Sequence, residues 1–252
     1  MALLVPDAHL LYICARGCLR GVLMTAYEMH AENRMSWVGV AEDDLANGRL
    51  EEVTFASIQE IIENSLEKVI NSHVNITGAG RTDKGVNAWG QVASFKINKD
   101  FEPDKLRLAI NFYLPEDIRI IKIFRVPDNF NARRSALSRE YKYFIYHGQV
   151  CPPVFNNFVW WRKGKSWNLE AAKKACELIQ GRHNFTAFCR KGECPEDPFR
   201  TIDKLKIKTH GNISIISVKA QSFLTNMVRI IVGNINNIAL GKKNFEWLQN
   251  LL

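Results

Sequence analysis

Residues 78–92 read GAGRTDKGVNAWGQV, and this stretch decides how the rest of the chain is interpreted. Three glycines surround an Arg-Thr-Asp triplet, and the apolar alternation that follows predicts a strand over 91–97. Because glycine adopts backbone conformations that other residues resist, we expect a tight turn ahead of that strand. Loops on rigid strands often carry chemistry, so Arg81 and Asp83 become candidate functional residues. On this stretch alone, a structural turn with a solvated aspartate is the alternative.

The segments on either side of the turn predict two blocks of helices and strands. Ser57 and Glu60 have the spacing of a capping box, in which each side chain accepts a hydrogen bond from a backbone N–H, so a helix is expected to begin at Ile58. Asn168 and Gly181 likewise bracket a helix as N-cap and C′ residue. Hydrophobic periodicity predicts helices at 58–70, 105–112, 169–180 and 223–240, and strands at 91–97, 118–126, 141–147, 205–209 and 213–220.

The order of these elements predicts the fold class. Strands and helices do not alternate regularly, which indicates an α+β protein with mostly antiparallel sheet. The total of 252 residues is enough for one large domain or two modest ones. We expect a poorly matched segment over 1–34, an N-terminal α/β half with the turn over 35–126, and a C-terminal α/β half over 127–252.

Several classes of function are excluded or disfavoured by missing patterns. The turn satisfies neither the GxxxxGK[ST] nor the GxGxxG spacing, which argues against a nucleotide-phosphate loop. The six cysteines form no CxxC pair, so reduced thiols and no metal site are expected. No apolar run approaches the ~18–20 residues that span a bilayer.

Charge is distributed unevenly along the chain. The net charge is +8, yet residues 1–80 hold five basic and eleven acidic residues, and residues 81–252 hold 29 and 15. The positive charge therefore belongs to the last two-thirds, beginning at the turn itself. Such asymmetry favours a polyanionic partner, with nucleic acid ahead of a membrane surface. A soluble basic enzyme is the alternative that charge alone leaves open.

Six motifs in the same order identify a family resemblance. The run Gly80–Val92 resembles the signature of the TruA family of tRNA pseudouridine synthases, and five further blocks resemble family motifs: Asn111–Ile118 (NFYLPEDI), Phe130–Ala136 (FNARRSA), Ser138–Tyr143 (SREYKY), Gly181–Cys189 (GRHNFTAFC) and Ser222–Gly233 (SFLTNMVRIIVG). Lys84 and the Phe-Cys ending at Cys189 incline the resemblance toward the archaeal and eukaryotic branch.

The resemblance implies a fold and an activity. Two related halves would share a continuous antiparallel sheet, with the active-site cleft between them. The activity would be isomerisation of uridine to pseudouridine in the anticodon stem-loop of tRNA, around positions 38–40. It would need no cofactor and no metal, because the reaction is an internal rearrangement. Family members are commonly homodimers, and a cytoplasmic location is expected, with an organelle or the nucleus left open.

The resemblance also assigns roles to individual residues. Asp83 is the expected catalytic aspartate, acting as a nucleophile or by stabilising positive charge at C1′. Tyr141 is expected to stack on the flipped uracil and to help remove the C5 proton. Arg229 is expected to pair with Asp83 and keep it ionised. Arg81 would contact phosphate or hold the turn, and Arg133 would reach the pocket from among the phosphate-binding arginines.

Two departures from the family pattern bear on activity. Asn87 and Asn131 stand where the family usually has histidines, so these positions keep a hydrogen bond but cannot titrate near neutrality. The family's opening strand is not found cleanly, with residues 37–41 as a degenerate trace, and its final strand is not found after the last helix. A catalytically impaired tRNA-binding or chaperoning protein of the same fold is therefore the alternative function.

Overall fold

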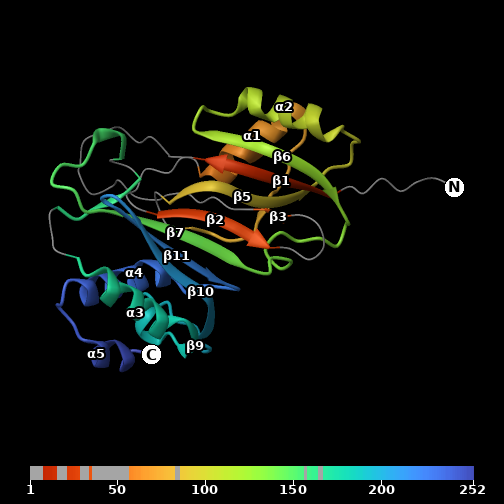
Figure 1. Ribbon diagram of the computed structural model, residues 1–252. Helices are drawn as coiled ribbons and strands as arrows, with labels where there is room; N and C mark the ends of the chain where they lie inside the picture. Colours follow the sequence, from red (N-terminus) through yellow and green to blue (C-terminus); the bar gives the residue numbers. More distant parts are fainter. Residues whose placement is uncertain are drawn as a thin grey trace. The chain divides into compact units, whose positions relative to one another are not determined.

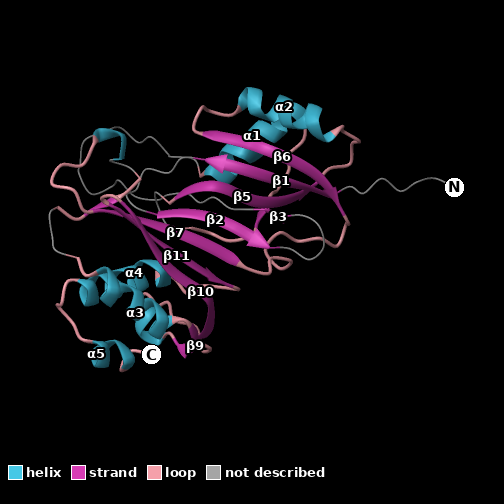
Figure 2. Ribbon diagram, viewed as in Figure 1, coloured by secondary structure: helices cyan, strands magenta, loops and turns pink. Residues whose placement is uncertain are grey.

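The computed structural model describes residues 8–15, 22–28, 34–35, 57–82, 86–155, 158–163 and 167–252, and for residues 8–35 it describes the strands alone. The chain divides into two compact units, the second of which comprises Arg20–Leu23 and Ser138–Leu252. Both units combine helices with largely antiparallel strands (Figures 1 and 2), so the α+β class predicted from the sequence is confirmed. The sequence-based boundary near Pro127 falls before this division.

The N-terminal unit is built on an antiparallel sheet. Strand β1 pairs on one side with β6 and on the other with β5, while β4 pairs with β5 and β3 pairs with β2. β2 follows β5 in the strand order. The bounds of these strands are β1 Ala8–Ala15, β2 Val22–Glu28, β3 Arg34–Met35, β4 Thr77–Gly78, β5 Asn87–Lys96 and β6 Ile118–Val126.

Two helices of this unit begin where local chemistry predicts. Helix α1 (Ile58–Ile70) begins with the full capping box: Glu60 N–H donates to Ser57 Oγ and Ser57 N–H donates to the Glu60 carboxylate, both at 3.2 Å. Helix α2 (Pro103–Tyr113) begins with Glu102, whose carboxylate accepts from two backbone N–H groups. Both helices end as their buried apolar face ends, and α2 packs against β6 and α1.

The side chain of Asn111 on α2 makes two hydrogen bonds with the sheet. The Asn111 amide donates to Ile120 O at 2.8 Å, and its oxygen accepts from Ile120 N–H at 2.7 Å. Ile120 lies on β6, so the amide supplies a local substitute for a neighbouring strand and satisfies backbone groups that would otherwise stay open. The N-x-x-L-P block around Asn111 thus has a structural use.

The C-terminal unit has a mixed five-stranded sheet. Its antiparallel strands follow the order β7-β11-β10-β9, and β8 runs parallel to β7. The bounds are β7 Arg139–Tyr146, β8 Trp160–Trp161, β9 Gly181–Asn184, β10 Phe199–His210 and β11 Ile213–Ala220, with 3-10 turns at Pro153–Phe155 and Thr186–Phe188.

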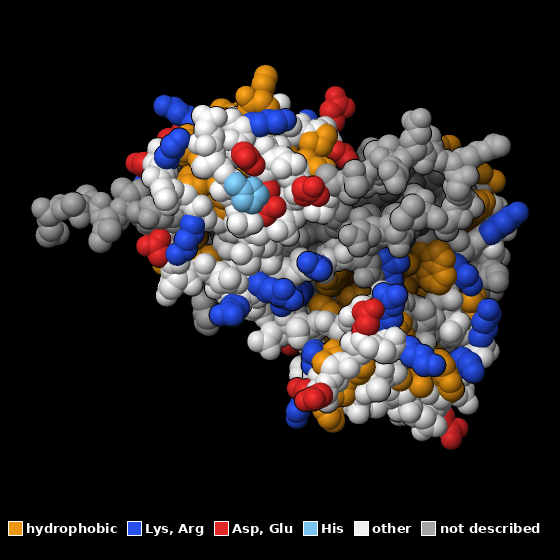
Figure 3. Space-filling view, turned by 180° about the vertical axis from the view of Figure 1, so that it is seen from behind, with side chains coloured by type: hydrophobic (Ala, Val, Ile, Leu, Met, Phe, Trp, Pro, Cys, Tyr) orange, Lys and Arg blue, Asp and Glu red, His pale blue; other side chains and the backbone are white. Residues whose placement is uncertain are grey.

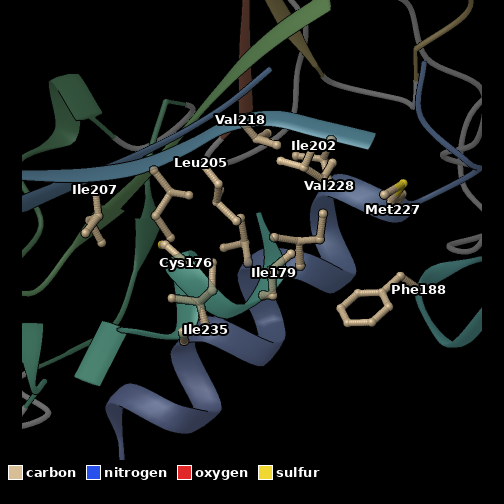
Figure 4. Packing of buried hydrophobic residues seen from close by; sticks show 14 of the residues in the cluster. Cys176, Ile179, Phe188, Ile202, Leu205, Ile207, Val218, Met227, Val228 and Ile235 are labelled. Atoms are coloured by element: carbon tan, nitrogen blue, oxygen red, sulfur yellow. The ribbon is translucent and has the colours of Figure 1, made fainter. Parts of the chain in front are cut away.

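Helices α3 (Leu169–Ile179) and α4 (Met227–Ala239) pack on one face of this sheet, and α5 (Phe245–Gln249) packs on α3. Figure 4 shows side chains of α3 and α4 meeting those of β10 and β11, with Cys176, Ile179 and Ile235 from the helices. Leu205, Ile207 and Val218 from the strands are among the residues buried there. Apolar burial of this extent is the main term that holds the unit together.

The observed bounds correct three sequence predictions. The last helix begins at Met227, not Phe223, because Asn226 takes a left-handed conformation (φ 62°) that ends the preceding turn. Strand β5 begins at Asn87, ahead of the predicted start, and it is buried on both faces, which hides the alternation. Strands β1 and β2 lie inside the segment 1–34 that the sequence left unread. The trace proposed at 37–41 lies outside the described residues.

Candidate active site

The glycine-punctuated turn is anchored on its N-terminal side by β5. Gly78 pairs with Ala93, and Ala79 N–H donates to Val92 O at 3.1 Å. Ala79 is fully buried, whereas Arg81 is exposed. The chain therefore leaves the sheet between Ala79 and Arg81, which supports the predicted turn there. Asp83, with its neighbours 84–85, lies outside the described residues, so its predicted role stays a prediction.

Beyond the turn the chain is buried again. Val86, Asn87 and Ala88 are all at most 4% exposed. Before it, the Thr82 hydroxyl oxygen is buried, and it has no hydrogen-bond partner among the residues that the structure describes. The residues that follow the turn are thus embedded in the N-terminal unit.

Asn131 organises the loop that carries Arg133. Its side-chain oxygen accepts from the backbone N–H groups of Arg133 and Arg134, both at 3.0 Å. Ala132 N–H donates to Ser94 Oγ on β5 at 3.1 Å, so the loop is tied to the sheet. An amide performs this function without needing to titrate, which explains how asparagine can replace the family histidine here. Arg133 itself is exposed, as a phosphate-contacting side chain would be.

Tyr141 lies on β7 with its side chain on the helix-covered face of the C-terminal sheet. It packs against the buried core and meets the ring of Phe223 edge to face, with centroids 5.1 Å apart. Its partner on β11 is the buried residue Val218. The half-buried ring therefore has one side fixed by an aromatic neighbour. This is the placement expected of a tyrosine that presents a flat surface to a base.

Tyr143, two residues further along β7, lies on the same face and connects the strand to Arg229. Burial raises the pKa of the Tyr143 hydroxyl, and the positive charge of Arg229 opposes that rise. The Tyr143 ring also meets Trp160 edge to face, with centroids 6.1 Å apart. The positive charge of Arg229 on α4 thus acts on the hydroxyl of a tyrosine in the strand that carries Tyr141.

Arg229 occupies the first turn of α4, and the start of that helix is unusual. Asn226 at the N-cap has φ 62° and ψ 3°, and its side chain makes no capping hydrogen bond. The preceding turn is held instead by its neighbours, since Arg190 N–H donates to Thr225 O at 3.0 Å and Met227 N–H donates to Leu224 O at 3.1 Å. The half-buried Arg229 therefore lies at a helix start whose position is determined by tertiary contacts.

The structure groups the predicted residues by unit. Tyr141 and Arg229 both belong to the C-terminal unit, while Arg81 and Arg133 belong to the N-terminal unit with the catalytic turn. Sequence reasoning missed Tyr143 and Phe223 as neighbours of these two. Tyr143 could have been found from its i+2 spacing to Tyr141 on a strand, which places both on one face. Phe223 required knowledge of where α4 begins.

Four cysteines have described side chains, and all four are free thiols: Cys151, Cys176, Cys189 and Cys194. Among the described residues, no group of three or more His, Cys, Asp or Glu side chains could hold a metal ion. Cys176 is buried in the core, and burial raises its pKa to about 12, so this thiol stays protonated. Likewise, no described helix is both long enough and apolar enough to cross a bilayer.

Comparisons with known proteins show the family to which the chain is similar. The family model described as tRNA pseudouridine synthase matches residues 49–133 and 175–252, which include the turn and the start of α4. The chain is 39% identical over 196 residues to the tRNA pseudouridine synthase A of Thermoanaerobacter sp. (strain X514), covering 78% of this chain and 80% of that protein.

Two further relatives carry the same name. That of Finegoldia magna is 37% identical over 78% of this chain and 80% of its own length. That of Francisella tularensis subsp. mediasiatica is 34% identical over 78% of this chain and 76% of its own length. The chain therefore belongs to the TruA family of tRNA pseudouridine synthases, which confirms the resemblance drawn from its motifs. Its enzyme class is accordingly that of an isomerase.

Proposed function

We propose that this protein isomerises uridine to pseudouridine in the anticodon stem-loop of tRNA, around positions 38–40, with Asp83 as its catalytic residue. The observation that carries the proposal is the family match across residues 49–133, which contains the turn GRTD at 80–83. The anchoring of that turn on β5 supports it, because a catalytic carboxylate must be held in one place.

The reaction itself explains the small set of groups required. The bond from C1′ to N1 of the base breaks, the base turns, and a bond forms from C1′ to C5. C5 loses its proton and N1 gains one, so atoms and charge balance without an external reactant. Asp83 would act either as a nucleophile at C1′ or as a counter-charge to a cationic C1′. Both roles require the ionised carboxylate.

The C-terminal unit would supply the surroundings of the base. Tyr141, fixed against Phe223, offers a ring on which a flipped uracil can stack, and its hydroxyl could take part in removing the C5 proton. Arg229 would pair with Asp83 and keep it ionised. These roles need the two units to form two halves of one continuous sheet with a cleft between them, which we include in the proposal.

The arginines of the N-terminal unit would hold the RNA. Arg81 and Arg133 are both exposed, and each lies beside a backbone segment fixed to β5. Such guanidinium groups suit contacts to phosphate oxygens, which position an RNA without reading its sequence. We also propose a homodimer in the cytoplasm. Leu108 and Phe112, one turn apart on α2 and 61% and 82% exposed, offer an apolar surface for association, which light scattering would test.

The test is a site-resolved pseudouridine map of unmodified tRNA incubated with the purified protein. Wild type should form pseudouridine in the anticodon stem-loop. Asp83→Asn should abolish the product while leaving tRNA affinity largely intact, because the amide keeps the shape but cannot ionise. Glu196→Gln, which removes an exposed carboxylate from another loop, is the matched control and should keep full activity.

A second pair of variants tests the electrostatic part. Arg229→Ala should lower turnover by about 100-fold with a smaller change in tRNA affinity, and Arg229→Lys should recover part of it. Full activity in Asp83→Asn would remove Asp83 from the mechanism. Tight, salt-sensitive tRNA binding by wild type with no pseudouridine formed would instead favour the noncatalytic RNA-binding alternative.

A further inference from the structure

The C-terminal sheet has a second face whose charge is unlike that of the helix-covered face. Along β10, Leu205 and Ile207 point into the core, and the residues between and around them alternate outward. Those outward residues are basic: Lys204, Lys206 and Lys208 are all exposed. At about 3.4 Å per residue, their attachment points follow one another at ~7 Å intervals along the strand.

Neighbouring strands extend this row. In the observed register, Lys204 lies opposite Lys219 on β11, and Lys206 lies opposite Ser217, which in turn lies opposite Lys142 on β7. On β9, Arg182 lies opposite Thr201, and its guanidinium lies 5.3 Å from the centre of the exposed Phe199 ring. We call this set the lysine face; its members are Lys142, Arg182, Lys204, Lys206, Lys208 and Lys219.

The acidic residues on this face are too few to neutralise it. Glu140 lies opposite Lys219, and Asp203 precedes Lys204 at a bulge in β10. In the part of the chain that the structure describes, Lys204, Lys206 and Lys208 form no ion pair. Like charges side by side on a sheet repel one another and cost stability. A polyanion laid across the face would remove that cost.

Two features separate the lysine face from the proposed catalytic residues. The register puts Tyr141 and Tyr143 on the helix-covered side, with Lys142 between them on the other. Helix α3 packs on β10 at the tyrosine side, and buried side chains of α4 meet that same face. Lys and Arg side chains are also seen at the surface of the C-terminal unit, at the lower right of Figure 3.

We propose that the lysine face binds the phosphate backbone of tRNA at a place remote from the uridine that is isomerised. The inference rests on the proposed function for the identity of the RNA. The face fits phosphates because its three β10 lysines are exposed and regularly spaced, and because point charges of this kind add affinity without reading bases. The opposite orientation of Tyr141 is the reason that the contact must lie away from the target base.

The experiment compares two triple variants with the same change in charge. Lys204→Gln, Lys206→Gln and Lys208→Gln remove the row on β10. Lys96→Gln, Lys105→Gln and Lys242→Gln remove three exposed cations scattered elsewhere and serve as the matched control. The dissociation constant is measured against salt concentration for whole unmodified tRNA and for an isolated anticodon stem-loop, with circular dichroism to verify folding.

The β10 triple should weaken binding of whole tRNA and lower the slope of log K against log salt by about 2–3, as expected when three phosphate contacts are lost. Its affinity for the stem-loop should stay at the wild-type value, and so should turnover at saturating tRNA. The dispersed triple should change the slope by less than one. A β10 triple that matches the dispersed triple would overturn the proposal, since only net charge would then matter.

Two further outcomes would also overturn it. Equal weakening of stem-loop and whole tRNA would place the lysine face at the target site. Undiminished tRNA binding by the β10 triple, with loss of its binding to vesicles of anionic phospholipid, would assign the face to a membrane. Failure of the proposed reaction is distinguished separately: wild type would form no pseudouridine, yet the difference in salt slope between the two triples would persist.

Discussion

Helices α1 and α4 each have 13 residues, yet they begin in opposite ways. α1 begins with a reciprocal capping box between Ser57 and Glu60, so its first turn is stabilised by residues adjacent in sequence. α4 begins at Asn226, which has a left-handed backbone and offers no side-chain cap. Its start is set by the turn before it, which Arg190 N–H joins through Thr225 O.

This difference separates a helix end that is only structural from one that carries Arg229. A local cap places a side chain oxygen over the first N–H groups and fills the space in front of them. At α4 the residue at the N-cap makes no such bond, and Arg229 lies in the first turn of the helix. The less stable way to begin the helix occurs at the proposed active site, where structure that costs stability is commonly found.

Truncating a buried side chain should have the largest effect on the free energy of unfolding, and it should do so on both helices because each buries an apolar face. Leu66 on α1 and Ile231 on α4 are both fully buried. Leu66→Ala and Ile231→Ala should each lower the free energy of unfolding by about 2–5 kcal/mol, through lost burial and the cavity left behind. Urea denaturation followed by circular dichroism measures both.

Ile121, 45% exposed on β6, supplies the control for these truncations. Ile121→Ala should change the free energy of unfolding by roughly 0.5 kcal/mol or less, as surface substitutions do. If Ile231→Ala proved as mild as Ile121→Ala while Leu66→Ala stayed severe, then α4 would be loosely anchored along its whole length. The contrast between the helices would then not be confined to their first turns.

The same contrast explains which helix bounds could be predicted from the sequence. The bounds of α1 were predicted correctly, because its capping box and its buried face are both patterns of residues close together in the sequence. The start of α4 was predicted four residues early, at Phe223, because the apolar pattern continues through the preceding turn. No neighbouring residue in the sequence predicts the left-handed conformation of Asn226. A helix start that tertiary contacts determine cannot be read from its own residues.

The candidate site shows the same limit: its residues could be predicted from motifs, but their tertiary contacts could not. Asp83, Tyr141 and Arg229 could be named from motifs, and the family match over residues 49–133 and 175–252 includes Asp83 and Arg229. The ring contact of Tyr141 with Phe223, and the influence of Arg229 on the pKa of Tyr143, depend on the register of β7 and on where α4 begins. The lysine face was missed for a related reason. Its members come from four strands, and only the pairing of those strands brings them to one side.

A smaller effect should follow from removing the cap of α1. Ser57→Ala deletes the oxygen that accepts from Glu60 N–H, and it should lower the free energy of unfolding by about 1 kcal/mol. Ser57→Thr keeps an accepting oxygen and should cost a few tenths of a kcal/mol at most. Denaturant midpoints of the two variants give the comparison. Equal stability of both would show that the capping box does not hold this helix end.

The smallest effects should come from Asn226, where the two kinds of helix start can be told apart. Its side chain makes no capping bond, so Asn226→Gly should leave the free energy of unfolding within about 0.5 kcal/mol of wild type. Asn226→Ala places a Cβ without a polar group at φ 62° and should cost about 1 kcal/mol. At Ser57 the side-chain oxygen decides stability, whereas at Asn226 the backbone conformation does. If Asn226→Gly were as costly as Asn226→Ala, the amide itself would be the stabilising group, and α4 would begin with a cap after all.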